Sequence, residues 1–297
     1  MSNRNRFIQL QRLVFFLAFF LSSSIASADL ILTAPPRENQ AKGNELYGPI
    51  AEGLTELLGE KVVYQQPKSW ADYANKMRDG YYDIIFDGPH FVAWRQKNLK
   101  HKPIVSLPGT LEFYIVTDKS NKQINKVRDL VGKKICGMPS PHLATDLIYD
   151  IFKNPVLQPT IYEVKGGQRN SFQAFKDGKC VATIFRSTLY KRLPDEERKQ
   201  LKIITKTRRL PNQTISISQR LHKQANEIAE YLVSKDGAIT ADNLLSRYSK
   251  RKKQFIKAKP EKFVGAVSYT HLRAHETNDL ISYAVFCLKK GGGGGGG

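Results

Sequence analysis

Strand-like and helix-like segments alternate twice along this chain, and this alternation restricts the possible folds more than any other feature. The first series predicts strands over residues 29–34, 61–65 and 82–86, separated by helices over 50–58 and 70–78. Short apolar strands that alternate with helices are typical of parallel β-α-β units. The first part of the chain therefore predicts an α/β unit built on parallel strands.

A second series of the same kind follows. It predicts strands over 133–138, 160–164 and 181–185, with helices over 141–152 and 170–176. In both series a helix ends at an Asp-Gly pair just before a buried strand, as MRDGYYDIIFDG and FKDGKCVATIFR show. Two complete series predict two similar α/β lobes.

Two extended segments, 111–117 and 213–218, are placed to link these lobes. Predicted helices at 223–234 and 242–248 follow the second link and must pack on one lobe. If the chain returns to the first lobe, the double crossing permits hinge closure over a cleft. The expected division is a first lobe of residues 29–112 plus 214–266 and a second lobe of residues 113–213.

The N-terminus has the features of a secretory signal. Arg4, Arg6 and Arg12 precede the apolar run LVFFLAFFL at 13–21, and the segment ends in the small residues Ala26-Ser27-Ala28. An N-terminal membrane anchor is the alternative, but about 20 apolar residues are needed to span a bilayer and this run is about half as long. We expect cleavage after Ala28 and an exported, periplasmic protein.

Residues 267–297 are expected to be a non-native tail. VSYTHLRAHET corresponds to a reading frame of a common sequencing-library adapter, ISYAVFCL to the flow-cell end of the same libraries, and the chain ends in glycines. A natural tail with a glycine-rich end is the alternative. We therefore exclude His271, His275 and Cys287 from the search for a metal site and expect none.

The charge balance favours an anionic partner. The whole chain has a formal charge of +20, and residues 29–266 retain 41 basic and 25 acidic residues. The basic run at 247–262 could bind nucleic acid or an anionic membrane. Export argues against nucleic acid, and a solvated helical face is the simpler interpretation.

No catalytic signature is present. His90, His101, His142 and His222 are scattered, and the chain contains no HExxH, GxSxG, dinucleotide-binding or P-loop motif. We therefore expect neither an enzyme nor a bound cofactor. Cys136 and Cys180 lie on predicted strands of the second lobe, and in an exported protein they either form a disulfide or remain buried thiols.

Polar side chains follow the predicted strands, where open α/β sheets bind ligands. Helix N-termini at the same edge favour anions, and aromatic residues, among them Tyr47 and Trp70, could form an apolar wall. The candidate ligand-binding residues are Tyr73, Asp87, His90 and Tyr114 in the first lobe and crossing, and Ser140, His142, Thr145, Arg169, Asn170 and Arg186 in the second lobe.

Several of these segments carry a family resemblance. The run PIAEGLTELLG at 49–59, then Tyr73, then DGYYDIIFDGP at 79–89, resembles the phosphate, phosphite and phosphonate substrate-binding proteins of ABC transporters. KKICGM at 133–138, Gly166-Gly167 and RLPNQTI at 209–215 agree with later landmarks of that family. The resemblance covers residues 29–266. It implies a type II periplasmic-binding fold, in which two α/β lobes joined by a two-strand hinge enclose a ligand cleft.

The sequence departs from that family at the expected ligand site. The family's hydroxyl-rich loop is replaced by Ser140-Pro-His-Leu-Ala-Thr145, and Arg169-Asn170 stand where a histidine is common. Arg186 stands where the family often has an acidic residue that holds an amino group. These departures argue against an aminophosphonate, whereas an anion without an amine and a specificity that has changed from that of the family both agree with them.

The expected function is a periplasmic solute-binding protein that closes over a small anionic solute and delivers it to a membrane permease and its ATPase. We expect a monomer that performs no covalent chemistry. The alternative is a ligand-sensing module that presents a solute to a receptor kinase. A periplasmic enzyme on the same fold is a third possibility, but it would need a catalytic pair that the sequence does not show.

Overall fold

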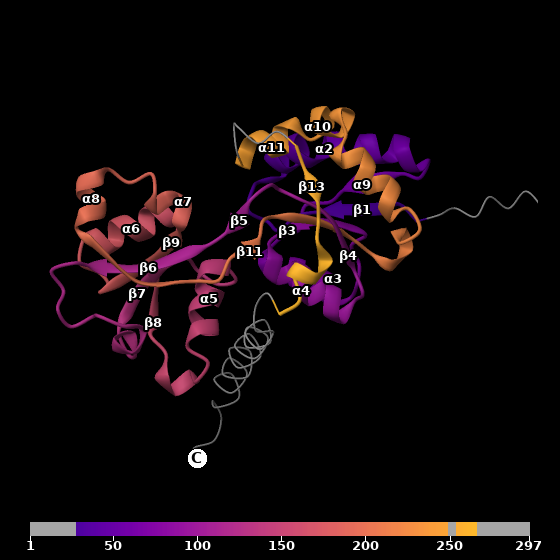
Figure 1. Ribbon diagram of the computed structural model, residues 1–297. Helices are drawn as coiled ribbons and strands as arrows, with labels where there is room; N and C mark the ends of the chain where they lie inside the picture. Colours follow the sequence, from indigo (N-terminus) through magenta and orange to yellow (C-terminus); the bar gives the residue numbers. More distant parts are fainter. Residues whose placement is uncertain (1–27, 249–253, 266–297) are drawn as a thin grey trace, which may run out of the picture.

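A computed structural model describes residues 28–248 and 254–265, which form two α/β lobes (Figure 1). The expected tail at 267–297 and residues 1–27 of the expected signal lie outside the described residues. Within the described ranges, no helix combines the length and apolarity that a membrane crossing requires.

The first lobe, lobe 1, contains a six-stranded sheet with the order β13-β4-β12-β3-β1-β2. Strands β1, β2 and β3 are mutually parallel, as the first series predicts, whereas β12 runs antiparallel between β3 and β4. The strands are β1 (Leu30–Thr33), β2 (Val62–Tyr64), β3 (Ile84–Asp87), β4 (Lys102–Ser106), β12 (Thr214–Ile217) and β13 (Ile256–Lys257).

Helices cover both faces of this sheet (Figure 1). Side chains of α2, α9 and α11 belong to the main core cluster on one face, and those of α3 and α4 form an aromatic cluster on the other. The helices are α2 (Gln40–Leu58), α3 (Trp70–Arg78), α4 (Pro89–Asn98), α9 (Ala225–Val233), α10 (Lys235–Thr240) and α11 (Asp242–Tyr248).

The second lobe, lobe 2, contains a five-stranded sheet with the order β10-β6-β9-β7-β8. β7 pairs in parallel with β8 and β9, as the second series predicts, and β6 runs antiparallel to β9. The strands are β6 (Phe113–Asp118), β7 (Lys134–Gly137), β8 (Thr160–Glu163), β9 (Ala182–Arg186) and β10 (Leu201–Lys206); the helices are α5 (Leu143–Ile151), α6 (Gln168–Lys176), α7 (Ser187–Tyr190) and α8 (Asp195–Lys199).

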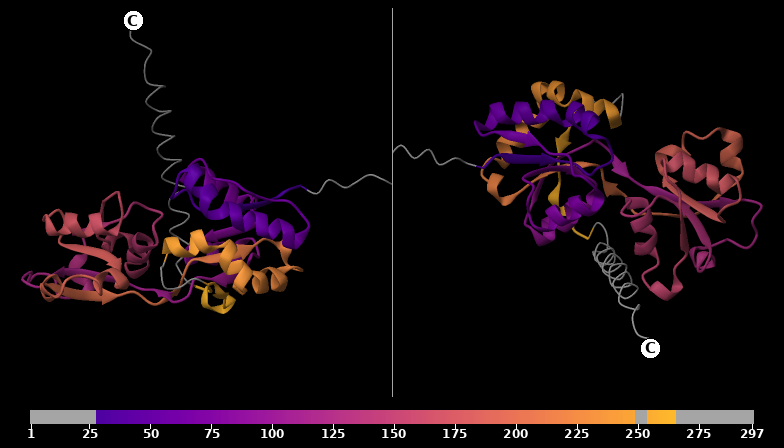
Figure 2. Two further views of the ribbon diagram at one scale, coloured as in Figure 1. Left: turned by 90° about the horizontal axis from the view of Figure 1, so that it is seen from above. Right: turned by 180° about the vertical axis from the view of Figure 1, so that it is seen from behind.

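The chain crosses between the lobes twice. The crossing segments are β5 (Thr110–Leu111) and β11 (Leu210–Pro211), which pair antiparallel as a separate two-stranded ribbon (Figure 2). The expected links at 111–117 and 213–218 were therefore mostly wrong, because their main parts are β6 and β12 inside the two sheets. A two-residue strand is too short to produce a pattern that a sequence can reveal.

Apolar contacts continue beneath this crossing from one lobe into the other. Val92 and Ala93 of α4 belong to the same buried cluster as Leu143 and Leu147 of α5. Leu111 from the crossing joins that cluster. The lobes are thus joined by a strand pair and by a shared apolar contact beside it.

A disulfide joins Cys136 of β7 to Cys180, just before β9, with a Cα–Cα distance of 5.6 Å. This is one of the two alternatives that the sequence left open. Cys136 is the penultimate residue of β7, so the disulfide anchors this strand close to the point where its loop leaves the sheet.

The double substitution of Cys136 and Cys180 by serine is expected to destabilise the protein by about 2–4 kcal/mol. The disulfide joins residues 44 positions apart, and the unfolded chain regains entropy when this loop is opened. Denaturant unfolding with and without reductant measures the effect. Reductant should lower the stability of the wild type and leave the double variant unchanged. An equal response of both proteins would contradict the prediction.

Candidate functional site

A cleft of about 680 Å³ lies between the lobes, and residues of both lobes line it. Its walls come mainly from the loops that follow β1 and β3 in lobe 1 and β7, β8 and β9 in lobe 2. These are the carboxyl ends of parallel strands, where α/β sheets bind ligands. Its polar lining residues are Arg37, Glu38, His90, Ser140, His142, Lys165, Gln168, Arg186, Gln213 and Arg247.

Arg37 and Trp70 form one wall of lobe 1. Ser69 caps α3 by accepting a hydrogen bond from the Asp72 N–H at 3.1 Å, which places Trp70 at the first helical position. The guanidinium carbon of Arg37 lies 6.0 Å from the centroid of the Trp70 ring. A cationic group therefore stands beside an aromatic ring in this wall.

His90 is the second residue of α4 and is 2% exposed. Neither of its ring nitrogens makes a hydrogen bond of ordinary geometry within the described part of the chain. Burial, reinforced by Arg37 and His142, lowers the pKa of His90 well below its usual range, although the Pro141 carbonyl of lobe 2 acts in the opposite direction. The neutral ring carries one donor and one acceptor nitrogen, and both are buried at the cleft wall.

Gly88 is required by the position of His90. A Cβ atom at residue 88 would lie 2.7 Å from Cε1 of His90 and 2.9 Å from its Nδ1. The Gly-Pro pair on which the family resemblance partly rests thus has a packing reason here, because the glycine makes room for the imidazole and Pro89 begins α4.

His142 caps α5 on the opposite wall. Its Nδ1 accepts a hydrogen bond from the Ala144 N–H at 3.1 Å, so the proton of the neutral ring is on Nε2. Burial, with Arg37 and Arg186 acting in the same direction, lowers the pKa of His142 to about 4. One residue from each lobe therefore brings positive charge to the same imidazole.

Arg186 ends β9 and is held from its backbone. Its N–H donates to Oε1 of Gln168 at 2.8 Å, and Gln168 begins α6. Burial is the main cause that lowers the pKa of Arg186, with Arg192 contributing, yet arginine remains charged under physiological conditions. This arrangement supplies a fixed cation on the lobe 2 wall.

The loop before α6 is compact because of its two glycines. Gly166 and Gly167 have φ angles of 86° and 107°, which a residue with a side chain rarely adopts. Asn170 donates to the Lys165 carbonyl at 3.1 Å, and a Cβ at residue 166 would lie 2.3 Å from its Nδ2. Asn170 therefore braces the loop, while Lys165 and both glycines line the cleft.

The charge of the lining is predominantly positive. Four cationic side chains belong to it, Arg37, Lys165, Arg186 and Arg247, whereas Glu38 is the one carboxylate among the described lining residues. Glu38 is already paired, because Arg247 donates to its Oε1 from Nη2 at 2.6 Å and from Nε at 3.1 Å. An entering anion would therefore meet cations that no lining carboxylate fully neutralises.

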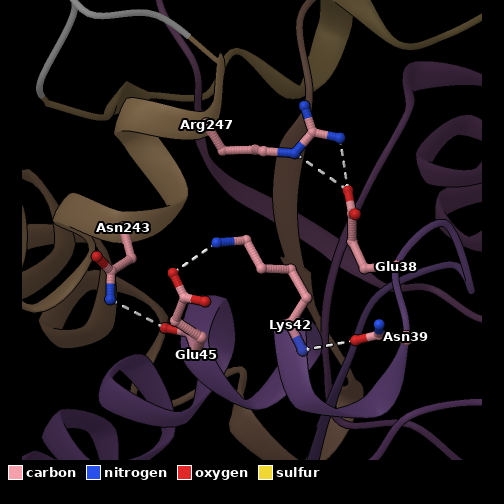
Figure 3. A network of polar contacts seen from close by, with 6 residues as sticks. All are labelled: Glu38, Asn39, Lys42, Glu45, Asn243 and Arg247. Carbon is pink, nitrogen blue, oxygen red and sulfur yellow. Dashed lines mark hydrogen bonds and ion pairs between the residues drawn. The ribbon is translucent and has the colours of Figure 1, made fainter.

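The Glu38–Arg247 pair is part of a polar network that fastens α11 to the start of α2 (Figure 3). Asn39 caps α2 by accepting from the Lys42 N–H at 2.9 Å. Asn243 of α11 donates to the Glu45 carbonyl at 3.1 Å. These contacts hold the end of α11, with Arg247 and Tyr248, at the edge of the cleft.

The structure divides the ten residues expected from the sequence into two groups. Those that line the cleft are His90, Ser140, His142 and Arg186. Those that do not line it are Tyr73, Asp87, Tyr114, Thr145, Arg169 and Asn170.

Asp87 and Tyr73 belong to a buried ion-pair cluster. Arg95 of α4, which is fully buried, donates to the two carboxylate oxygens of Asp87 at 2.7 Å and 2.8 Å. The Tyr73 hydroxyl also donates to Asp87, and Arg95 donates to the Ser216 hydroxyl at 3.1 Å. Because Arg95 already satisfies this carboxylate, Asp87 positions α4 rather than facing the cleft.

The other four expected residues outside the cleft lining either have structural partners or are exposed. Thr145 donates to the Met138 carbonyl at 2.5 Å, and Tyr114 donates to Glu112 at 3.2 Å. Arg169 is exposed, and Asn170 braces the loop described above. Sequence reasoning missed Arg37, Glu38 and Lys165 as site residues, although Arg37 and Glu38 follow the first predicted strand at the same sheet edge.

The structure has the two-lobed architecture of a type II periplasmic binding protein. A sequence profile described as "ABC transporter, phosphonate, periplasmic substrate-binding protein" matches residues 32–263. The chain belongs to this family, whose members are substrate-binding proteins of ABC transporters and not enzymes.

Individual relatives agree with this assignment. The chain is 28% identical over 115 residues to the phosphate-import protein PhnD of Mycolicibacterium smegmatis, and this match spans 36% of each chain. The structure of PhnD1 from Prochlorococcus marinus in complex with methylphosphonate has a TM-score of 0.54 at 14% identity, covering 79% of this chain and 94% of that one. A Xanthomonas citri protein bound to ATP has a TM-score of 0.62 at 9% identity, covering 84% and 96%.

Asp146 of α5 lies behind the Ser140–His142 loop and is 2% exposed. Its Oδ1 accepts from the Ser140 hydroxyl at 3.3 Å, and its Oδ2 has no hydrogen-bond partner in the described part of the chain. Burial, which outweighs the opposite effect of Ser140, raises the pKa of this carboxyl to about 7.

Asp146→Asn is expected to change how stability depends on pH. Because the pKa is raised on folding, the native state binds the proton more tightly, so this stabilisation is complete below about pH 4 and is lost as the pH rises to about 7. Denaturant unfolding from pH 4 to 8 should therefore show the wild type losing up to about 4 kcal/mol relative to the variant. Parallel pH profiles would contradict the prediction.

Asp87→Asn is expected to destabilise the protein by about 3–5 kcal/mol, because it leaves the Arg95 guanidinium buried without its counter-charge. Denaturant unfolding measures this loss. Asp79→Asn, at an exposed helix end in the same lobe, is the control and should change stability by less than about 0.5 kcal/mol. Equal effects of the two substitutions would contradict the structural role of Asp87.

Proposed function

We propose that this protein is the periplasmic solute-binding component of an ABC importer and that its cleft captures an anion with a phosphonate- or phosphate-type group. The observation that carries the proposal is the positive charge that both lobes bring to the cleft, because Arg37 of lobe 1 and Arg186 of lobe 2 line the same cleft as the His142 imidazole. An anion bound near that imidazole would be attracted by cations of both lobes.

Four of the lining side chains would have complementary roles in binding this anion. Arg37 and Arg186 supply charge and several N–H donors, and a guanidinium can bind a phosphoryl group through two parallel hydrogen bonds. His142 offers Nε2–H, and His90 offers either a donor or an acceptor from its neutral ring. Such a set suits the tetrahedral oxygens of a phosphonate or phosphate.

Ligand capture would act through the hinge. A ligand that contacts both lobes binds the closed arrangement more tightly than the open one, so it shifts the population toward closure. The β5–β11 pair is the segment about which the lobes would move, because the chain passes between them only there within the described residues. Residues 29–112 with 214–266 would move against residues 113–213.

The relatives support the solute class. The Mycolicibacterium smegmatis protein is a phosphate-import protein, and the Prochlorococcus marinus structure contains methylphosphonate. The chain spans 36% of the length of the curated relative, so its solute, its permease with the associated ATPase, and its monomeric state are parts of this proposal. Cleavage after Ala28 also remains a prediction.

Arg186→Ala is expected to weaken binding of methylphosphonate and inorganic phosphate by about tenfold to a hundredfold, because it removes a charge-assisted hydrogen bond to a buried anion. Isothermal titration calorimetry measures the affinity. Arg128→Ala is the matched control, since this exposed arginine precedes β7 at the end opposite to the cleft loops. Absence of binding by the wild type would overturn the proposed solute class, and an unchanged affinity of Arg186→Ala would overturn the proposed site.

A further inference from the structure

The cleft is large for a simple oxyanion. It measures about 680 Å³, whereas a methylphosphonate ion, with five non-hydrogen atoms, occupies on the order of 100 Å³ when each water-sized group takes roughly 30 Å³. Closure that halved the cleft would still leave most of it unfilled by such an ion. The size falls in the range of pockets that enclose larger organic ligands.

The unfilled part has apolar walls. The apolar lining residues come from both lobes and from the crossing: Trp70, Leu111, Phe113, Met138, Leu143 and Tyr248. A phosphoryl group gains nothing from such surface, but an organic substituent attached to it would lose contact with water there.

Trp70 is the residue best placed to contact such a substituent. It lines the cleft and is only partly buried, whereas Tyr73 and Phe91 of the same aromatic cluster are buried. The indole is held edge-to-face against Tyr73, with centroids 6.2 Å apart, and stacked with Phe91 at 6.2 Å. A ring fixed in this way can stack on a ligand ring at low entropic cost.

Arg37 connects the two parts of the site. Its guanidinium lies 6.0 Å from the centroid of the Trp70 ring, and its charge acts on His142 across the cleft. A ligand whose phosphoryl group binds Arg37 therefore carries its substituent to the indole. Glu38 is engaged by Arg247, so the described lining gives an ammonium substituent no free carboxylate.

We propose that the cleft selects an organophosphorus anion with an aromatic substituent, whose phosphoryl group binds between Arg37 and Arg186 while its ring packs on Trp70. This inference rests on the proposed function. The same chemistry occurs in an aryl phosphonate and in an aryl phosphate monoester.

The test compares phenylphosphonate with methylphosphonate by isothermal titration calorimetry. The wild type is expected to bind phenylphosphonate at least about tenfold more tightly, from stacking and apolar burial. Trp70→Leu, which keeps an apolar side chain but removes the ring, should lower the phenylphosphonate affinity to about that for methylphosphonate. Arg186→Ala should weaken both ligands.

Trp94 provides a matched control, because it is the second of the two tryptophans and lies outside the cleft lining. Trp94→Leu should retain the preference for phenylphosphonate. In that variant Trp70 is the remaining tryptophan, so phenylphosphonate should change its fluorescence, whereas methylphosphonate should have a smaller effect.

Equal affinities of the wild type for the two phosphonates would overturn the inference and leave the proposed function standing. Binding of neither would overturn both. A Trp70→Leu variant that weakens both ligands equally would also overturn the inference, since Trp70 would then act only through packing. Tighter binding of phenyl phosphate than of inorganic phosphate would support it and assign the monoester as a source of the ligand.

Discussion

The antiparallel pairing of β5 with β11 is the constraint on which the cleft depends. It brings both crossings together at one place, so that the strand ends of lobe 1 face those of lobe 2. Arg37 and Trp70 line the same cleft as lobe 2 residues because this short ribbon fixes where the lobes meet. The shared apolar cluster of α4 and α5 beside it limits the directions in which the lobes can separate.

Local signals explain why much of the fold could be predicted from the sequence. Ser69 begins α3, and Asp-Gly pairs at 79–80 and 177–178 end α3 and α6. The helix α4 was not predicted from the sequence. Most of its residues are buried, so it lacks the alternation of apolar and polar faces by which an amphipathic helix is recognised. Arg95 of this helix is fully buried, although it is charged. Its burial becomes understandable only when its ion-pair partner on β3, Asp87, is known.

The candidate site was predictable in its location but not in its residues. Asp87 and His90 are three residues apart at the same sheet edge, yet one pairs with Arg95 in the interior and the other lines the cleft. The same contrast separates Thr145, bonded to the Met138 carbonyl, from His142 at the start of the same helix. Which side of a turn faces the cleft depends on tertiary partners, which spacing along the chain does not reveal.

The charge of the cleft comes from arginine and lysine rather than from histidine, and this follows from burial. Desolvation lowers the pKa of both cleft histidines, so they are neutral near pH 7 and act as directed hydrogen-bonding groups. The guanidinium groups of Arg37 and Arg186 stay charged over that range. Among the described groups near the Ser140 loop, Asp146 is then the one whose charge changes close to neutrality. Its ionisation would place a negative charge behind a loop of this cleft, whose described lining is otherwise predominantly cationic.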